Sequence, residues 1–270
     1  MNLMHRLHSR LLLTIALASM PMSRAAVAQE FAAVVSPPRF EMAAQPGERI
    51  RQVVEITNAG SQPATYHMRT ADWSLGADGG VTFSEDLTPG SCRPWVAIER
   101  HEIEVPAGGR YRYRMEVQPP ADAPAGECRF ALMIEGDAQH VQTAGGMTVP
   151  VSGRIGVIVY VSVGTAAPEL RFASTSVIEP DRGATPALTV HNAGNAHGRL
   201  DGFLTGTDAD GRRLEFTPSS LPILPGETRT IPLSASEGAT PVASVAYPIR
   251  LQGVIEWGGR RTELDEQFAQ

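Results

Sequence analysis

Apolar and polar residues alternate with a period of two in short segments along most of the chain after residue 30. The clearest segment is 111–117, where Tyr111, Tyr113, Met115 and Val117 alternate with arginine and glutamate. Such alternation predicts β-strands that bury one face. We expect further strands over residues 31–36, 39–42, 49–56, 66–73, 81–83, 95–98, 102–105, 128–134 and 147–163. Helical periodicity is scarce, so an all-β fold is predicted.

Turn-forming residues separate these segments. The glycine-rich stretch 76–80 predicts a hairpin that joins the strand ending at Trp73 to residues 81–83. Pro37 and Pro38 suit an edge strand that changes from one sheet to the other. We expect Trp73 to fill the core of a β-sandwich.

The second half of the chain repeats this pattern. Residues 164–168 are a candidate linker, and beyond them Asn192-Ala-Gly follows a strand just as Asn58-Ala-Gly does earlier. A hairpin turn is predicted at 208–211 and closing strands at 249–257. The fold predicted is all-β, with two immunoglobulin-like β-sandwich domains in tandem over residues 29–164 and 165–270. Alternatively, the two halves share only this type of turn and are not built alike.

Residues 1–28 have the composition of a secretory signal peptide. Arg6 and Arg10 precede the apolar run 11–18, and Ala26-Val27-Ala28 follows it. The run is too short to span a bilayer, although an uncleaved anchor is the alternative. Removal leaves 20 arginines against 29 acidic residues and a net charge of −9. We therefore expect a soluble, exported protein that does not bind nucleic acid.

The two cysteines, Cys92 and Cys128, are expected to form a disulfide, because an exported protein meets an oxidising environment. Two free, buried thiols are the alternative.

Residues that would carry catalysis or bind a metal are missing or badly spaced. The chain contains no lysine, which excludes a Schiff-base or phosphate-loop lysine. The histidines after the signal peptide lack metal-ligand spacing. No Gly-x-Ser-x-Gly motif occurs, and the aspartates at 208 and 210 fit a turn better than a calcium loop. We predict neither enzyme activity nor a cofactor.

The order of several motifs resembles the PapD-like periplasmic chaperones that assemble pili and fimbriae. In the first half these are Val35 to Phe40, Ala71-Asp72-Trp73, Arg93-Pro94-Trp95, Val105 to Gly108 and the valine-rich segment that ends at Tyr160. Val190 to His197, Asp210-Gly211 and Leu224-Pro225-Gly226 follow in the second half. The resemblance implies a boomerang-shaped pair of domains in the periplasm, with a fimbrial subunit as partner and an outer-membrane usher as a further one. A paired Cys92 and Cys128 would mark a divergent member.

The resemblance also implies site residues. Such chaperones lend an edge strand to an incomplete subunit, and the matching alternation here is Met147, Val149 and Val151. These residues could instead line the domain's own core, or cap a second copy of the chain in a dimer. The family binds the subunit's terminal carboxylate with an arginine and a lysine. Arg39 matches the arginine, whereas Gly156 stands at the lysine position and Arg154 is the nearest basic residue on that face; both arginines could also be ordinary surface charges.

Two other functions fit the same composition. A surface or structural protein with two immunoglobulin-like modules would need neither a donor strand nor a basic cleft. A carbohydrate-binding module would need exposed aromatic residues, but Trp73, Trp95 and Trp257 lie within strand patterns and suit core packing better.

Overall fold

The computed structural model describes residues 31–142, 146–179 and 183–270. The predicted signal peptide, residues 1–28, lies outside the described residues. Regular structure in the described part is almost entirely strand. The bounds in the first half are β1 Ala33–Ser36, β2 Arg39–Ala44, β3 Ile50–Asn58, β4 Ala64–Leu75, β5 Val81–Ser84, the 3₁₀ turn η1 Arg93–Trp95, β6 Val96–Ile98, β7 Glu102–Val105, β8 Arg110–Val117, β9 Gly126–Gly136, β10 Gln139–Gln142, β11 Thr148–Val151 and β12 Arg154–Val163.

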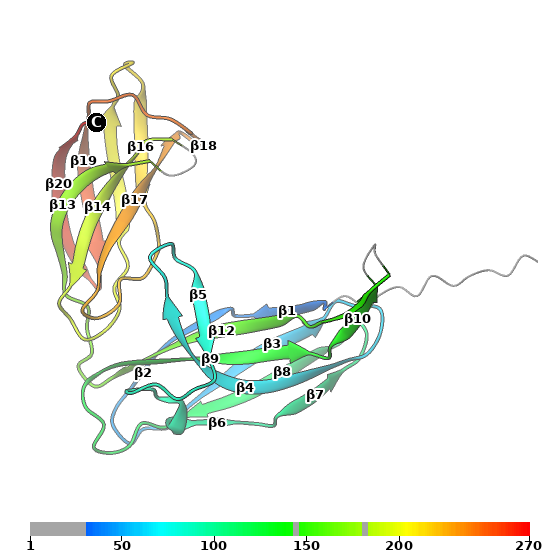
Figure 1. The fold of residues 1–270 in the computed structure, drawn as a ribbon. Helices are drawn as coiled ribbons and strands as arrows, with labels where there is room; N and C mark the ends of the chain where they lie inside the picture. Colours follow the sequence, from blue (N-terminus) through cyan, green and yellow to red (C-terminus); the bar gives the residue numbers. More distant parts are fainter. Residues whose placement is uncertain (1–30, 143–145, 180–182) are drawn as a thin grey trace, which may run out of the picture.

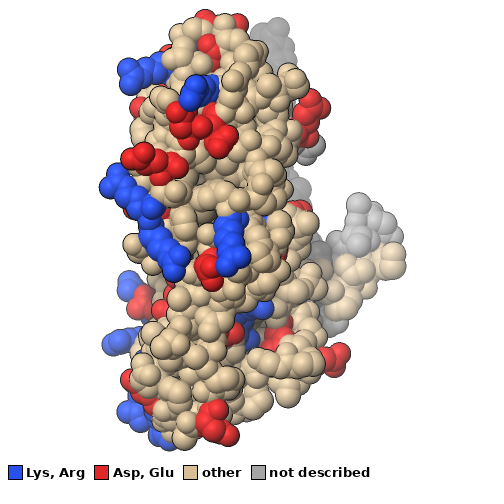
Figure 2. All heavy atoms as spheres, turned by 90° about the vertical axis from the view of Figure 1, so that its left-hand side faces the viewer, with Lys and Arg blue, Asp and Glu red and all other residues tan. Residues whose placement is uncertain are grey.

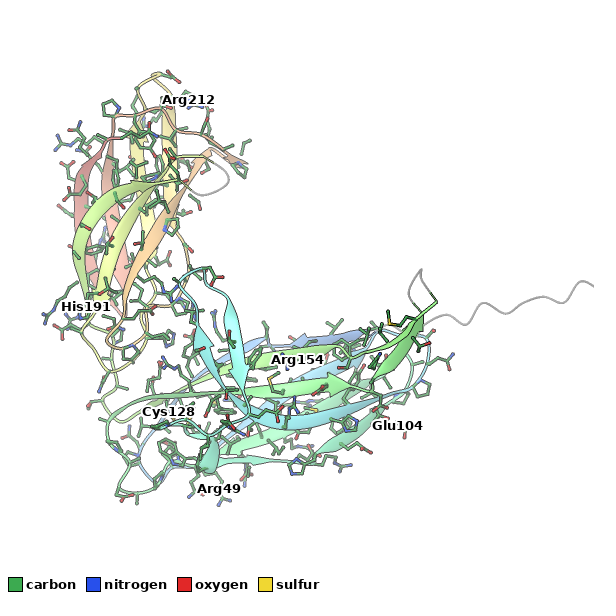
Figure 3. All side chains as sticks on the ribbon, viewed as in Figure 1. Arg49, Glu104, Cys128, Arg154, His191 and Arg212 are labelled. Atoms are coloured by element: carbon green, nitrogen blue, oxygen red, sulfur yellow. The ribbon has the colours of Figure 1, made fainter. Side chains whose placement is uncertain are left out.

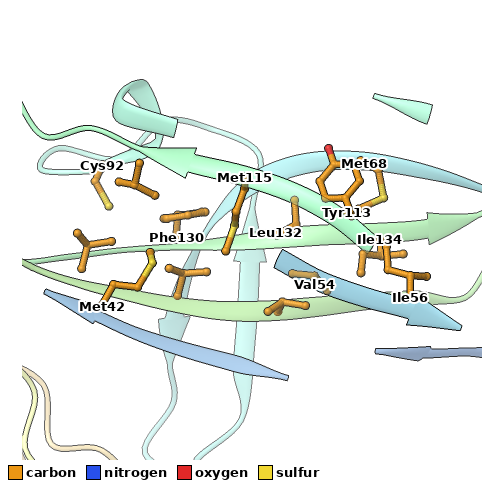
Figure 4. Packing of buried hydrophobic residues seen from close by; sticks show 14 of the residues in the cluster. Met42, Val54, Ile56, Met68, Cys92, Tyr113, Met115, Phe130, Leu132 and Ile134 are labelled. Carbon is orange, nitrogen blue, oxygen red and sulfur yellow. The ribbon is translucent and has the colours of Figure 1, made fainter. Parts of the chain in front are cut away.

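Two sheets form the first domain. One has the order β1-β3-β8-β6, and the other has the order β2-β12-β9-β4-β5 with β7 also paired to β4. The chain passes from one sheet to the other between β1 and β2, which confirms the predicted change of sheet at Pro37-Pro38. Alternate residues of facing strands, such as Met115 of β8 and Phe130 of β9, fill the space between the sheets (Figure 4).

The second domain contains β13 Leu170–Ile178, β14 Thr185–Asn192, β15 Asp201–Thr207, β16 Arg213–Pro218, β17 Thr228–Glu237, β18 Thr240–Pro241, β19 Ile249–Trp257 and β20 Arg260–Phe268. Their order is β13-β14-β17-β16-β15-β19-β20. The first half of β17 pairs with β14 and its second half with β16, so this strand joins the two layers. A separate apolar core fills the domain. The predicted two-sandwich, all-β fold is confirmed.

Trp73 lies on the opposite face from the predicted one. Its neighbours are Ala131, Met133 and Tyr160, which project from the outer face of the first domain's larger sheet, and its Nε1–H donates to Phe130 O at 3.1 Å. Phe83 and Leu224 pack against this outer cluster. The tryptophan is buried because a hairpin and the second domain cover that face.

The two domains meet at an angle, with their long axes strongly inclined to one another (Figure 1). The predicted hairpin at residues 76–80 is confirmed as the β4–β5 turn. It rises from the sheet of the first domain toward the base of the second, on the inner side of the elbow.

The repeated Asn-Ala-Gly segments have the same structural role in both domains. The Asn58 and Asn192 side chains are buried, and each accepts a hydrogen bond from the glycine amide two residues later. Each also donates to carbonyl groups of a distant segment, Val105 O for Asn58 and Ile223 O for Asn192. The buried amide therefore ties an early turn to a later loop.

Candidate partner-binding edge

β10 and β11 form a two-stranded ribbon that extends the β9–β12 hairpin beyond the end of the first sandwich (Figure 1). The Gly136 N–H donates to Gly153 O at 3.1 Å where the ribbon leaves the sandwich. The predicted valine-rich strand 147–163 is therefore two strands, β11 and β12, separated at Ser152-Gly153.

The strand edge along this ribbon lacks a partner among the described residues. β11 pairs with β10 alone. β12 pairs with β2 only from Ile158 onward, so residues 154–157 have β9 on one side and no strand on the other. An unpaired edge can accept a strand from another chain, because its backbone N–H and C=O groups have no partner.

The residues predicted to be donated lie on this ribbon. Met147 is 65% exposed and Val151 is 52% exposed, while Val149 is partly buried. None of them belongs to the core of the first domain, whose β12 contributions are Val157, Val159, Val161 and Val163. The alternative that they line their own domain's core is therefore wrong. These exposed apolar side chains make the ribbon a candidate contact surface.

The structure does not bring Arg39 and Arg154 together. Both project from the outer face of the larger sheet, but Arg39 is in register with Ile158. That position is four residues from Arg154, about 13 Å along the strand at 3.3 Å per residue. Arg39 is half exposed, with its Nε 3.0 Å from Glu41 Oε1. Figure 3 places Arg154 well away from the junction with the second domain.

Gly156, the residue that the resemblance aligns with a lysine, lies beneath the ring of Phe83. A Cβ atom placed on Gly156 would be 2.3 Å from Phe83 Cζ. Phe83 comes from β5, so the hairpin that rises inside the elbow folds back over this point of the sheet. The space that a lysine would occupy is filled by an aromatic side chain of the same chain.

The two cysteines are adjacent in the first-domain core but are not bonded to each other. Both are buried, and Figure 4 shows Cys92 among the core residues. The hydrogen bond with Cys128, together with burial, raises the pKa of the Cys92 thiol. The predicted disulfide is thus absent from this structure, in which both thiols are free.

A second group of polar residues lies beside the linker, where the domains touch. The side chain of Glu127 is fully buried in β9 and pairs with His197 of the second domain. The His197 ring stacks on Tyr160, with 3.9 Å between ring centroids. Arg199 Nη2 donates to the Tyr160 hydroxyl at 3.3 Å, and burial raises the pKa of that phenol. These contacts attach the second domain to the outer face of the larger sheet.

No family model and no curated protein sequence matches this chain. Several solved structures resemble it over most of its length. The YadV chaperone is 11% identical, the comparison covers 87% of this chain and 99% of that one, and the TM-score is 0.46. The SafB chaperone, solved with Salmonella enterica SafA pilin, is 12% identical, with 88% of this chain and 98% of that one covered and a TM-score of 0.47. The Pseudomonas aeruginosa CupB2 chaperone is 14% identical, with 87% of this chain and 100% of that one covered and a TM-score of 0.44. All three are chaperones by name. Their identities to this chain are too low for any function to be transferred.

Acidic and basic side chains are interspersed over both domains on the face that Figure 2 shows. No helix within residues 31–142, 146–179 and 183–270 is long and apolar enough to cross a membrane. Within the same residues, no three histidine, cysteine or acidic side chains gather as a metal site would require.

Two features of the edge had no signal in the sequence. The position of Phe83 over Gly156 depends on how the β4–β5 hairpin bends, which the alternation of the strands does not specify. The register of β2 against β12, which separates Arg39 from Arg154, depends on pairing between segments far apart in the chain. The long valine run did identify the strand that carries the open edge.

Proposed function

We propose that this protein is a divergent, periplasmic member of the PapD-like chaperones, which binds a fimbrial subunit along the β11–β12 edge and has no enzyme activity. The observation that carries the proposal is an unpaired strand edge whose apolar side chains, Met147, Val149 and Val151, lie outside the protein's own core. A subunit that lacks one strand offers a complementary open core and unpaired backbone groups.

The edge supplies both parts of such an interaction. On their other side, β11 and residues 154–157 have no strand partner among the described residues, and Val149 and Val151 follow the period of two that a groove accepts. Pro150 cannot donate to a ladder, so a subunit strand would find one hydrogen bond fewer at this position. Transfer of the subunit to an outer-membrane usher would follow from the same function.

The first prediction concerns the two valines of β11. Val149→Asp with Val151→Asp should reduce subunit binding at least a hundredfold, because each buried valine contributes about 1.5 kcal/mol and about 1.4 kcal/mol is a factor of ten. The measurement is co-purification with an exported immunoglobulin-like subunit, followed by titration of the purified pair.

Phe203→Asp is the matched control, since Phe203 is 50% exposed and lies on the second domain. Equal binding by the valine variant and this control would contradict donation through β11. Wild-type protein that retains no subunit at all would favour a free-standing surface module. A dimer that dissociates in the valine variant would instead identify a second copy as the occupant of the edge.

A second prediction concerns the arginines. Since Arg39 and Arg154 are separated along the sheet with Phe83 between them, they should not share one carboxylate. The effects of Arg39→Ala and Arg154→Ala on subunit binding should therefore add within about 0.5 kcal/mol in a double-mutant cycle. A coupling energy clearly above this value would indicate that both arginines hold the same group.

A further inference from the structure

The contact between the two domains has two parts, which the outer cluster around Trp73 and Tyr160 joins. One is the zone beside the linker, where the Glu127 N–H donates to Asn195 O at 2.7 Å and the Asn195 amide donates to Ala125 O at 3.2 Å. The other is the tip of the β4–β5 hairpin, residues 76–80, which meets the second domain on the inner side of the elbow (Figure 1).

Arg229 is the main polar contact at the hairpin tip. It lies on β17, is only 4% exposed, and donates through Nη1 to Gly76 O at 3.0 Å and more weakly to Ala77 O at 3.4 Å. Its other terminal nitrogen pairs with Glu227. Separation of the hairpin from the second domain would remove both carbonyl acceptors of Arg229 Nη1 and leave only the pair with Glu227, so this contact opposes separation.

Apolar residues of the second domain complete the contact. The Leu221 side chain lies directly over Gly79, where a Cβ would be 2.9 Å from Leu221 Cδ2. Gly79 also has a φ of +82°, a conformation that favours glycine. Leu224 packs on the outer cluster that contains Trp73 and Phe83.

Attachment at the linker alone would leave the second domain free to rotate about that point, as is usual for domains joined by a short linker and a small interface. A second contact away from the linker removes this freedom. We propose that the β4–β5 hairpin is a strut that fixes the angle of the elbow, and that Arg229 is the residue that locks it to the second domain. The same strut carries Phe83 over Gly156, so locking it also keeps this part of the outer face of the larger sheet covered.

This inference is tested on the free protein and does not depend on any partner. Spin labels on Glu104→Cys and Arg213→Cys, which replace exposed residues of β7 and β16, report the distance between the domains by double electron–electron resonance. The otherwise unaltered chain, labelled in the same way, shows whether the buried Cys92 and Cys128 react.

One narrow distance distribution is expected with Arg229 present, and a distribution at least twice as wide with Arg229→Gln. Arg250→Gln is the matched control, because Arg250 also lies on a strand of the second domain but pairs with Asp265 at the surface. Leu224→Ala removes only apolar contact and should also widen the distance distribution. This variant tests the proposal if Arg229→Gln fails to fold.

A wide distribution in the protein with Arg229, or distributions for Arg229→Gln and Leu224→Ala as narrow as that of the control, would overturn the proposal. Subunit binding through β11 would be unaffected by either result, so the strut and the proposed chaperone function can fail independently.

Discussion

Replacing Asn192 with alanine is expected to lower the free energy of unfolding of the second domain by about 4 kcal/mol, at roughly 1 kcal/mol for each hydrogen bond lost. The Asn192 side chain is fully buried and forms four hydrogen bonds. It donates to Ala196 O and Ile223 O, both at 2.8 Å, and accepts from the backbone N–H groups of Gly194 and Glu169. Alanine leaves these backbone groups without that partner, and the two carbonyl groups lie in the buried part of the site. Urea titration followed by circular dichroism measures the change.

Thr230→Ala provides the comparison on a neighbouring strand, because the Thr230 hydroxyl is exposed and makes only a 3.5 Å contact with Thr189. Thr230→Ala should change the free energy of unfolding by no more than about 0.5 kcal/mol. Similar midpoints for the two variants would mean that the buried amide does not hold the turn. Asn58→Ala should act in the same way on the first domain, where the Asn58 amide donates to Val105 O and Gln62 O.

The role of Asn192 illustrates what could be predicted from the sequence. Strand periodicity and turn residues are local properties, and they identified the hairpin at residues 76–80, the change of sheet at Pro37-Pro38 and the repeated Asn-Ala-Gly turns. The two-sandwich architecture follows from these patterns together with length and composition. The partners of the asparagine amides lie in distant loops, so the sequence indicated the turns but not what they hold.

The face of the sheet on which a side chain lies was harder to predict than the position of a strand in the sequence. In β9 both faces are buried, with Phe130 and Leu132 in the core and Ala131 and Met133 in the outer cluster. A continuous apolar run of this kind does not indicate which face a neighbouring strand presents to the core. Trp73 was therefore expected between the sheets, whereas it lies beneath the β4–β5 hairpin and the second domain.

In the candidate site, too, local sequence predicts the strands but not the contacts between distant segments. The strand that carries the open edge could be predicted from its valine-rich run, whereas its role as an edge was an expectation from the family resemblance. The separation of Arg39 from Arg154 could not, since it is set by the parallel register of β2 and β12 and by a phenylalanine from a third strand. Pairing between distant segments, rather than residue type, decides whether two charges meet.

Oxidation of Cys92 and Cys128 to a disulfide is expected to raise the free energy of unfolding by about 4 kcal/mol, because the bond would close the loop of residues 92–128 in the unfolded chain. Both thiols are buried in the first-domain core, and the Cys92 thiol is hydrogen-bonded to Cys128. Their burial also slows the reaction. The raised pKa of Cys92 keeps it as a thiol at neutral pH, and the thiolate is the form that attacks a disulfide.

The bond should therefore form during folding rather than after it. Refolding with oxidised glutathione transfers two electrons and two protons from the thiols to the glutathione disulfide, giving two molecules of reduced glutathione. Guanidinium unfolding with and without dithiothreitol then measures the stabilisation, and Cys92→Ala with Cys128→Ala should show no dependence on reductant. Two free thiols after oxidative refolding, with a midpoint that dithiothreitol leaves unchanged, would instead mean that the pair serves the core as reduced, hydrogen-bonded side chains.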